Sequence, residues 1–245
     1  MRILVIGESC TDVYQYGDCT RLCPEAPVPV FKAASDKTTN PGMAMNVWRN
    51  INSIADFRCD IETNDNWQEI TKTRCVDIRT NYIIVRIDSM DNDYKHCNVD
   101  KLDLSQYDVV VISDYDKGFL TEQDIHQIGF ESKVTFLDTK KILGDWCSTI
   151  SYIKINEFEY EKTKHKLNDK LNEKMIITLG PNGAMHKGVI YPVPKVEIKD
   201  TSGAGDTFVA SLAATYAQTG NIDASIKQAN INATMVVQRK GVSVV

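Results

Sequence analysis

Short runs of purely apolar residues recur along the chain, and they constrain the fold more than any other feature. Runs that are apolar on both faces are typical of strands buried on both sides of a parallel sheet. Segments with helical spacing or capping signals lie between them, so the pattern predicts an α/β fold with ligands at the carboxyl ends of the strands. The apolar runs are Ile3–Ile6, Val109–Ile112, Val134–Leu137 and Met175–Leu179, and the helical segments are Gly42–Ile54, Thr121–Gly129, Asn156–His165, Gly203–Gly220 and Ile222–Gln238.

Two further segments predict strands that lie outside this alternation. Val28–Ala33 and Thr71–Asp88 are β-branched and alternating, with no obvious helix between their strands. The second segment predicts a hairpin of Arg74–Arg79 and Tyr82–Ile87. We expect these strands to form a small sheet beside the main one, followed by a surface loop at Asp88–Asp93.

The composition is that of an ordinary folded domain with a slight acidic excess. Of the 245 residues, 42% are hydrophobic and 25% are charged, so the chain can bury a sizeable core and is not disordered. Its 28 basic and 33 acidic residues give a formal net charge of −5. Proteins that bind nucleic acid without sequence preference need an excess of Lys and Arg, so we expect no nucleic-acid partner.

Cysteine usage and the shortness of the apolar runs indicate a cytoplasmic protein. The seven cysteines are odd in number, widely spread and without a C-x-x-C pair, so neither a disulfide scaffold nor a zinc site is expected. The first apolar run is too short for a signal peptide, and no stretch approaches membrane-spanning length. We therefore expect no membrane partner.

The most informative motif is the stretch Asp200–Phe208, D-T-S-G-A-G-D-T-F, at the start of a predicted helix. Gly203 and Gly205 allow a tight turn, and the free N–H groups of the helix start form an anion site. A carboxylate there, Asp206, is repelled by a bound phosphate unless it has a chemical task. That task is general base, taking the proton from a hydroxyl that attacks a phosphoryl group. The alternative is a simple helix cap, which the short G-A-G-D string alone would favour.

The longer D-T-S-G-A-G-D-T-F string resembles the C-terminal signature of the ribokinase-like (PfkB) carbohydrate kinases. Tyr16–Val30 resembles the Y-G-x-x-x-R-x-x-P-E-A-P-V-P-V stretch of one subgroup, the D-glycero-β-D-manno-heptose 7-phosphate kinases. In bacteria such a kinase is often the first half of a bifunctional protein of ADP-heptose synthesis, which implies a role in lipopolysaccharide. The other matches, in family order, are Gly7–Tyr14, Thr71–Arg74, Arg86–Asp88, Ser113–Gly118, Asp138–Lys140, Asn156–Glu157 and Thr178–Gly183.

The resemblance implies a ribokinase-like three-layer α/β sandwich with a mostly parallel central sheet and a small β-sheet lid. It implies one kinase domain over residues 1–245, with lid strands from about 12–33 and 71–88. Because the lid of this family often serves as a dimer interface, we expect a homodimer through the lid strands.

For the sugar, the resemblance implies that Asp12 and Asn46 bind hydroxyl groups beside Gly42. The family usually has two adjacent glycines here, and Met43 replaces the second, which would narrow the pocket or change its preference. The alternatives are a turn-capping role for Asp12 and a polar helix position for Asn46.

For the phosphate already on the sugar, the resemblance implies a basic site made by Lys72, Arg74 and Lys117. A dianionic phosphate needs cationic donors, and Arg offers a fork of them. For Lys72 and Arg74 the alternative is a solvated strand face with alternating charge.

For the nucleotide, the resemblance implies ATP with Mg²⁺ and no direct protein ligand to the metal. Asn156 and Glu157 would lie near the triphosphate and the Mg²⁺, with Glu157 acting through water. For Asn230, which would line the adenine pocket, the alternative is an exposed position on a helix. The remaining expected nucleotide residues are Thr178, Gly180 and Gly183 at a strand end and Asn230 in the adenine pocket.

The chain departs from the family by being short. The span Val47–Ile70 has room for one helix and a brief polar stretch, where the family places a helix, a strand, another helix and a connection. We expect one β–α unit to be missing and one sheet edge to be exposed. From the resemblance we also expect the family's final helix to be missing and no nucleotidyltransferase-like domain to follow.

Together these features predict an ATP-dependent kinase that phosphorylates the C1 hydroxyl of D-glycero-D-manno-heptose 7-phosphate to the 1,7-bisphosphate. Asp206 would be the base, and the N–H groups around Gly203, Ala204 and Gly205 would stabilise the transferring phosphoryl group. Two alternatives stay open: a kinase for another sugar or sugar phosphate, and a reduced, non-catalytic nucleotide-binding homologue. Asp206 speaks against the last, since a pure binder needs no base.

Overall fold

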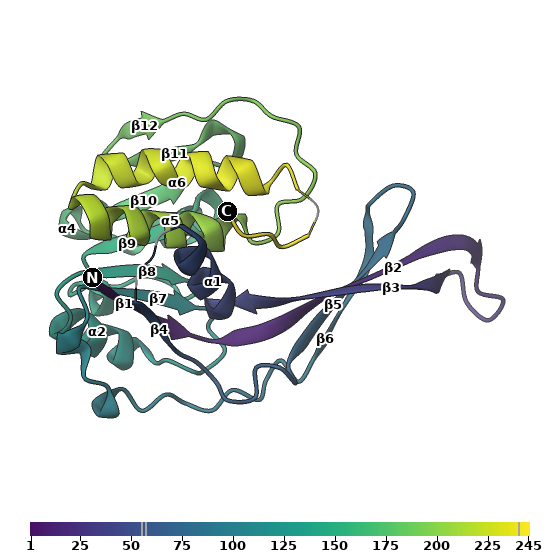
Figure 1. Ribbon diagram of the computed structural model, residues 1–245, viewed down its shortest axis with the longest axis horizontal. Helices are drawn as coiled ribbons and strands as arrows, with labels where there is room; N and C mark the ends of the chain where they lie inside the picture. The colour runs from purple at the N-terminus through teal and green to yellow at the C-terminus, as the bar shows by residue number, and fades with distance from the viewer. Residues whose placement is uncertain (55, 57, 240) are drawn as a thin grey trace.

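The computed structural model describes residues 1–54, 56, 58–239 and 241–245, which form two β-sheets with flanking helices (Figure 1). The larger sheet contains β1 (Arg2–Gly7), β4 (Arg58–Glu62), β7 (Val109–Asp114), β8 (Thr135–Thr139), β9 (Tyr152–Asn156), β10 (Met175–Thr178), β11 (Ala184–His186) and β12 (Val189–Tyr191). Its order is β12-β11-β10-β9-β8-β7-β1-β4. The strands from β10 to β4 are parallel, and β11 and β12 add an antiparallel edge.

Helices cover both faces of this sheet. Alternate residues of β1 show how: Ile3 and Val5 pack toward α1, α5 and α6, while Leu4 and Ile6 pack toward α2 on the opposite face. The predicted three-layer α/β sandwich is therefore confirmed. The helices are α1 (Ala44–Ile54), α2 (Glu122–Glu131), α3 (Glu157–Thr163), α4 (Asp169–Asn172), α5 (Ala204–Thr219) and α6 (Ile222–Val236). None of the helices described is long and apolar enough to cross a membrane.

The smaller sheet projects from the main body (Figure 1). It consists of β2 (Ser9–Leu22), β3 (Pro29–Met43), β5 (Thr71–Asp77) and β6 (Ile83–Ser89), in the order β3-β2-β5-β6. The predicted hairpin is the antiparallel pair β5–β6. Among the residues described, β2 beyond Gly17 pairs only with β3, so the outer parts of these two strands form a two-stranded ribbon.

Several strands were not predicted. β4 lies in the span for which only a helix and a polar stretch were expected, so that prediction is wrong. The sequence of β4, R-C-D-I-E, contains no apolar run that would indicate a strand, because an edge strand buries few of its side chains. β4 pairs in parallel register with β1 through backbone hydrogen bonds. The helix predicted from Gly42 begins at Ala44, because Gly42 and Met43 still belong to β3.

Candidate active site

Asp206, in the first turn of α5, lies at the centre of a buried hydrogen-bond network. Its side chain accepts hydrogen bonds from Asn46 Nδ2 at 2.9 Å and from the Tyr115 hydroxyl at 2.8 Å. Asn46 is held in turn by Asn50, whose Nδ2 donates to the carbonyl oxygen of Asn46 at 2.9 Å. The structure thus brings Asp206 and Asn46 together, as the sequence predicted for one site.

The environment of Asp206 suits a base. Burial raises the pKa of Asp206 to about 6, against the opposing effect of the hydrogen bonds from Asn46 and Tyr115. The negative charge of Asp138 raises this pKa further, while the positive charge of Lys154 lowers it. The carboxylate is therefore mostly ionised at neutral pH, and its pKa is close enough to neutral pH for it to accept and release a proton.

The start of α5 offers free N–H groups beside this carboxylate. Gly203 caps the helix in the left-handed region, with φ 77°. The N–H of Ser202 donates to Asp200 Oδ1 at 2.8 Å and that of Ala204 to the carbonyl of Thr201 at 3.2 Å. Within the described residues, the N–H groups of Gly203, Gly205 and Asp206 have no acceptor. The cradle expected from residues 203–205 is thus open at both glycines, while the N–H of Ala204 is engaged.

Lys154, on β9, was not predicted as a site residue. It is 3% exposed, and its Nζ donates to Asp138 Oδ2 at 2.7 Å. A Cβ placed on Gly205 would lie 3.1 Å from this Nζ, so the ammonium group lies against the helix start and Gly205 makes room for it. A lysine inside an apolar strand is the signal that points to it, because such residues are almost never buried without a partner.

On the expected sugar side, Asp12 and Arg74 form an ion pair. The Arg74 guanidinium also lies over the Tyr14 ring, 5.2 Å from its centre. A Cβ on Gly42 would lie 2.3 Å from Asp12 Oδ2, so only glycine leaves space for this carboxylate. Met43, which is 4% exposed, has φ 61°, a conformation that glycine adopts more readily.

Lys72 and Lys117 converge on a carboxylate that was expected in a surface loop. The Nζ of Lys72 lies 3.3 Å from Asp91 Oδ1, and the Nζ of Lys117 donates to Asp91 Oδ2. The Asp91 side chain is only 15% exposed, so the prediction of a surface loop is wrong at this residue. The structure therefore brings Lys72 and Lys117 together but places Arg74 on a different carboxylate.

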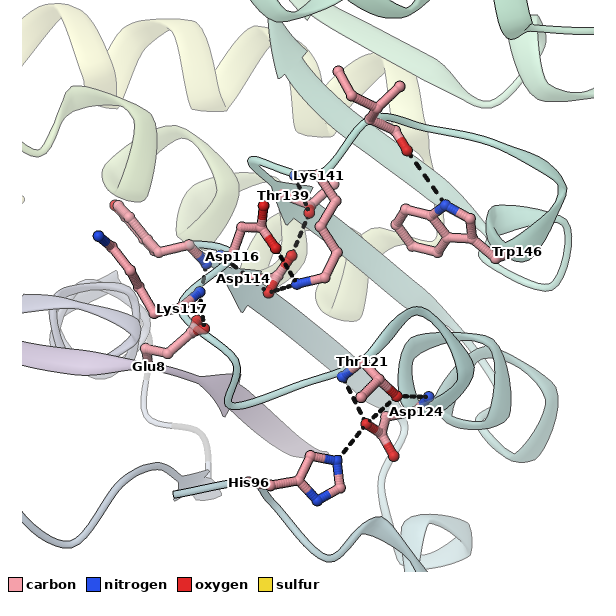
Figure 2. A network of polar contacts seen from close by, with 12 residues as sticks. Glu8, His96, Asp114, Asp116, Lys117, Thr121, Asp124, Thr139, Lys141 and Trp146 are labelled. Carbon is pink, nitrogen blue, oxygen red and sulfur yellow. Dashed lines mark hydrogen bonds and ion pairs between the residues drawn. The ribbon is translucent and has the colours of Figure 1, made fainter. Parts of the chain in front are cut away.

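Two buried carboxylates hold the loop that follows β7 (Figure 2). Glu8, which is fully buried, accepts hydrogen bonds from the N–H groups of Tyr115 at 2.8 Å and Lys117 at 3.0 Å. Asp114 accepts from Lys141 Nζ at 2.8 Å. Burial, and then the charge of Asp114, raise the pKa of Glu8. This loop carries Tyr115 to Asp206 and Lys117 to Asp91.

On the expected nucleotide side, Asn156 and Thr178 are paired neighbours at the carboxyl ends of β9 and β10. Asn156 caps α3 in a reciprocal pair with Glu159, which also pairs with Lys140. Glu157 is exposed. Within the described residues, no group of three or more His, Cys, Asp and Glu side chains is arranged to hold a metal ion.

The loop after β10 contains Gly180 and Gly183, with φ 56° and 91°. A Cβ on Gly183 would lie 2.0 Å from the carbonyl oxygen of Tyr191, so this position requires glycine. The two glycines shape the turn that joins β10 to the antiparallel edge of the sheet.

Asn230, on α6, is buried rather than exposed, and its Nδ2 donates to the carbonyl oxygen of Tyr191 at 2.7 Å. It lines a mostly apolar groove of about 630 Å³ between α6, β12 and residues 192–196. Thr178 and Gly180 are not among the residues that line this groove. The residues expected to bind the nucleotide are thus in two places: around the groove and at the carboxyl ends of β9 and β10.

Comparison with known proteins identifies the family of this chain. A family model described as pfkB family carbohydrate kinase matches residues 61–244. The Bifunctional protein HldE of Helicobacter pylori (strain J99 / ATCC 700824) is 30% identical over 294 aligned positions, which cover 98% of this chain and 63% of the relative. The protein of the same name from Helicobacter acinonychis (strain Sheeba) is 29% identical, with 98% and 63% covered. This chain therefore spans less than two thirds of the length of these relatives.

Solved structures share the fold. A ribokinase from Thermotoga maritima superimposes with a TM-score of 0.75 at 20% identity, covering 98% of this chain and 94% of that one. The phosphofructokinase-2 of Escherichia coli in complex with potassium gives 0.70 at 15% identity, covering 99% and 94%. At these identities the likeness establishes a ribokinase-like fold, with its mostly parallel central sheet and separate smaller sheet.

Proposed function

The chain belongs to the pfkB family of carbohydrate kinases, and we propose that it transfers the γ-phosphoryl group of ATP to the C1 hydroxyl of a heptose 7-phosphate. The observation that carries the proposal is Asp206, a buried but ionisable carboxylate next to the open N–H groups of Gly203 and Gly205. A base and an anion cradle side by side are what phosphoryl transfer to a hydroxyl requires.

In the proposed reaction, Asp206 accepts the proton of the sugar hydroxyl while the oxygen of that hydroxyl attacks the γ-phosphorus. Asn46 and Tyr115 each occupy one carboxylate oxygen, which leaves a further lone pair on each for the substrate. As the new O–P bond forms, the bond between the γ-phosphorus and the bridging oxygen breaks and ADP leaves. The free N–H groups and the Lys154 ammonium stabilise the charge on the transferring group.

Magnesium is expected with ATP, where it would neutralise charge on the phosphate oxygens. The oxygen donors at this sheet edge fit a water-mediated magnesium ion. Asp138 Oδ1 is buried and has no hydrogen-bond partner among the described residues, and a second carboxylate, Glu159, pairs with Lys140, two residues after Asp138 in the chain. These two residues would hold the ion through water, which Mg²⁺ gives up reluctantly. The expected residue Glu157 is exposed, which makes it a weaker candidate.

The heptose 7-phosphate is supported by the Y-G-x-x-x-R-x-x-P-E-A-P-V-P-V stretch and by the basic site near Asp12. Lys72 and Lys117 would bind the distal phosphate, so that its binding energy positions the reacting hydroxyl. The seven free cysteines and the use of ATP favour a cytoplasmic enzyme.

Met43 favours a second candidate, a kinase for another sugar or sugar phosphate. Its side chain is buried beside Cys10, where the family's second glycine would leave open space. A panel of heptoses, hexoses and their phosphates in a coupled ADP-release assay separates the two candidates. Turnover of another sugar without turnover of heptose 7-phosphate would overturn the proposed substrate.

The test of the mechanism is Asp206→Asn, assayed with ATP and D-glycero-D-manno-heptose 7-phosphate. We expect turnover to fall about 100- to 10,000-fold, the usual contribution of a general base, while calorimetry shows ATP binding little changed. Asp169→Asn, the same chemical change at an exposed position, serves as the matched control. Near-normal turnover by Asp206→Asn would sink the assignment of the base.

A further inference from the structure

The basic site assigned to the sugar phosphate already contains an anion. The two oxygens of Asp91 are shared between Lys72 and Lys117, and Oδ1 also accepts from the Tyr94 hydroxyl at 3.2 Å. Two ammonium groups and a hydroxyl around one anion are the donors that would bind a phosphate.

The loop that carries Asp91 is built to reach inward. β6 ends at Ser89, and Met90 then takes a left-handed conformation with φ 58°. The N–H of Asp93 donates to the carbonyl of Met90 at 3.2 Å, which closes a tight turn around Asp91. The neighbouring Asp93 is exposed, so one of two similar carboxylates in this short loop is directed at the lysines.

Asp91 remains an anion under assay conditions. Although burial raises its pKa, the hydrogen bond from Lys117 and the charge of Lys72 outweigh that effect and hold the pKa of Asp91 below its usual range. In the free protein the negative charge of Asp91 therefore partly balances the positive charges of Lys72 and Lys117.

We propose that Asp91 is a resident competitor: its carboxylate occupies, in the free enzyme, the position that the phosphate of the sugar phosphate takes when it binds. The inference rests on the proposed function and names the residue that sets its specificity. A dianion can replace the carboxylate and still satisfy both lysines, whereas a neutral sugar hydroxyl cannot compensate two ammonium groups. Asp91 therefore makes the site demand a phosphorylated sugar.

Solvent reaches the Lys117 side of this ion-pair group, which makes the exchange of the Asp91 carboxylate for a phosphate feasible. The Lys117 side chain is 31% exposed, and ion pairs that solvent can reach contribute little to stability. The Lys72 and Asp91 side chains are only 10% and 15% exposed, so Asp91 leaves Lys72 only as the phosphate takes its place. The loop that carries Asp91 has no helix or strand between residues 90 and 98.

The test is calorimetric titration with inorganic phosphate of wild type, Asp91→Asn and Asp93→Asn, each checked for folding by thermal unfolding. Asp93→Asn is the control: it removes the same charge two residues further along the chain, and the Asp93 side chain does not touch the lysines. We expect Asp91→Asn to bind phosphate about three- to tenfold more tightly than wild type, and Asp93→Asn to bind like wild type. Unchanged or weaker binding by Asp91→Asn would overturn the proposal.

A second variant locates the gain. In Asp91→Asn combined with Lys72→Met the extra affinity should disappear, since the lysine that Asp91 neutralised is gone. Persistence of the gain would place the phosphate elsewhere, for example at the start of α5, and would also overturn the proposal. Because phosphate binding needs no turnover, tighter binding by Asp91→Asn supports the inference even if heptose 7-phosphate is not the substrate. Conversely, turnover of that sugar without this gain leaves the proposed function standing and the inference refuted.

Discussion

The proton affinity of Asp206 is set by opposing neighbours. Burial raises its pKa to about 6, while the hydrogen bonds from Asn46 and Tyr115 lower it. Of these two donors, the phenol can be removed with the least change of shape, because phenylalanine keeps the ring that packs near Lys72 and Lys140. Substitution of Tyr115 therefore tests the proton affinity of Asp206 while Asp206 itself stays in place.

We expect Tyr115→Phe to move the acid limb of the pH profile to higher pH. Loss of a donor to the carboxylate destabilises the charged form, so the pKa of Asp206 rises above its present value of about 6 and less base is available in mild acid. The variant should lose proportionally more kcat/KM at pH 6 than at pH 8, as a full pH–rate profile would show. Tyr107→Phe, which removes a phenol that bonds to Asp60 instead, is the matched control. An acid limb that coincides with that of wild type would contradict the tuning role of Tyr115.

At the scale of elements, the loop after β7 depends on Glu8 in the connection between β1 and β2. Both oxygens of this buried side chain accept backbone N–H groups, and the loop delivers Tyr115 and Lys117 to the site. A glutamine in its place has one acceptor end and one donor end, so one N–H group would face another donor.

Glu8→Gln should therefore lower stability and weaken substrate binding together. A lost hydrogen bond that leaves a buried donor unpaired costs about 1–3 kcal/mol, which corresponds to a melting temperature lower by roughly 2–10 °C in a chain of this size. We also expect KM for the sugar phosphate to rise, because Lys117 loses its support. Glu69→Gln, at an exposed position, is the control. Wild-type values of both melting temperature and KM would show that Glu8 is not needed to position the loop.

Hydrophobic periodicity predicted the strands that are apolar on both faces and the helices that have a continuous apolar face. The apolar runs of β1, β7, β8 and β10 and the capped helices were found near their observed bounds. β9 was missed because Lys154 interrupts its apolar sequence, and the same buried charge makes Lys154 a candidate site residue. Asp206 and Asn46 could be paired through a resemblance. Glu8 and Asp91 could not, because their importance depends on partners far away in the sequence.

At the scale of the whole molecule, the region of the relatives that aligns with this chain is longer than the chain itself. The alignment with one of them extends over 294 positions, more than the 245 residues of this chain, so the relative has segments that this chain lacks. The edge strand β4 still completes the parallel part of the main sheet. The smaller sheet, by contrast, ends in β6, whose seven residues are all exposed.

β6 exposes a row of apolar side chains. Ile83, Val85 and Ile87 are 52%, 46% and 51% exposed, and within the described sheet β6 pairs with β5 only. An exposed apolar edge strand invites pairing with another chain. Together with the resemblance to kinases that dimerise through their lids, this surface leads us to propose a homodimer that buries β6.

Val85→Lys combined with Ile87→Lys should convert the proposed dimer to a monomer. Charges placed in the centre of a buried apolar interface lose their hydration without gaining partners, so association weakens strongly. Light scattering at micromolar concentration should give twice the chain mass of 27.6 kDa for wild type and a single chain mass for the variant. Phe130→Glu, which alters an apolar side chain 79% exposed on α2, should remain dimeric. A monomeric wild type, or a double variant that still dimerises, would show that β6 is not the interface.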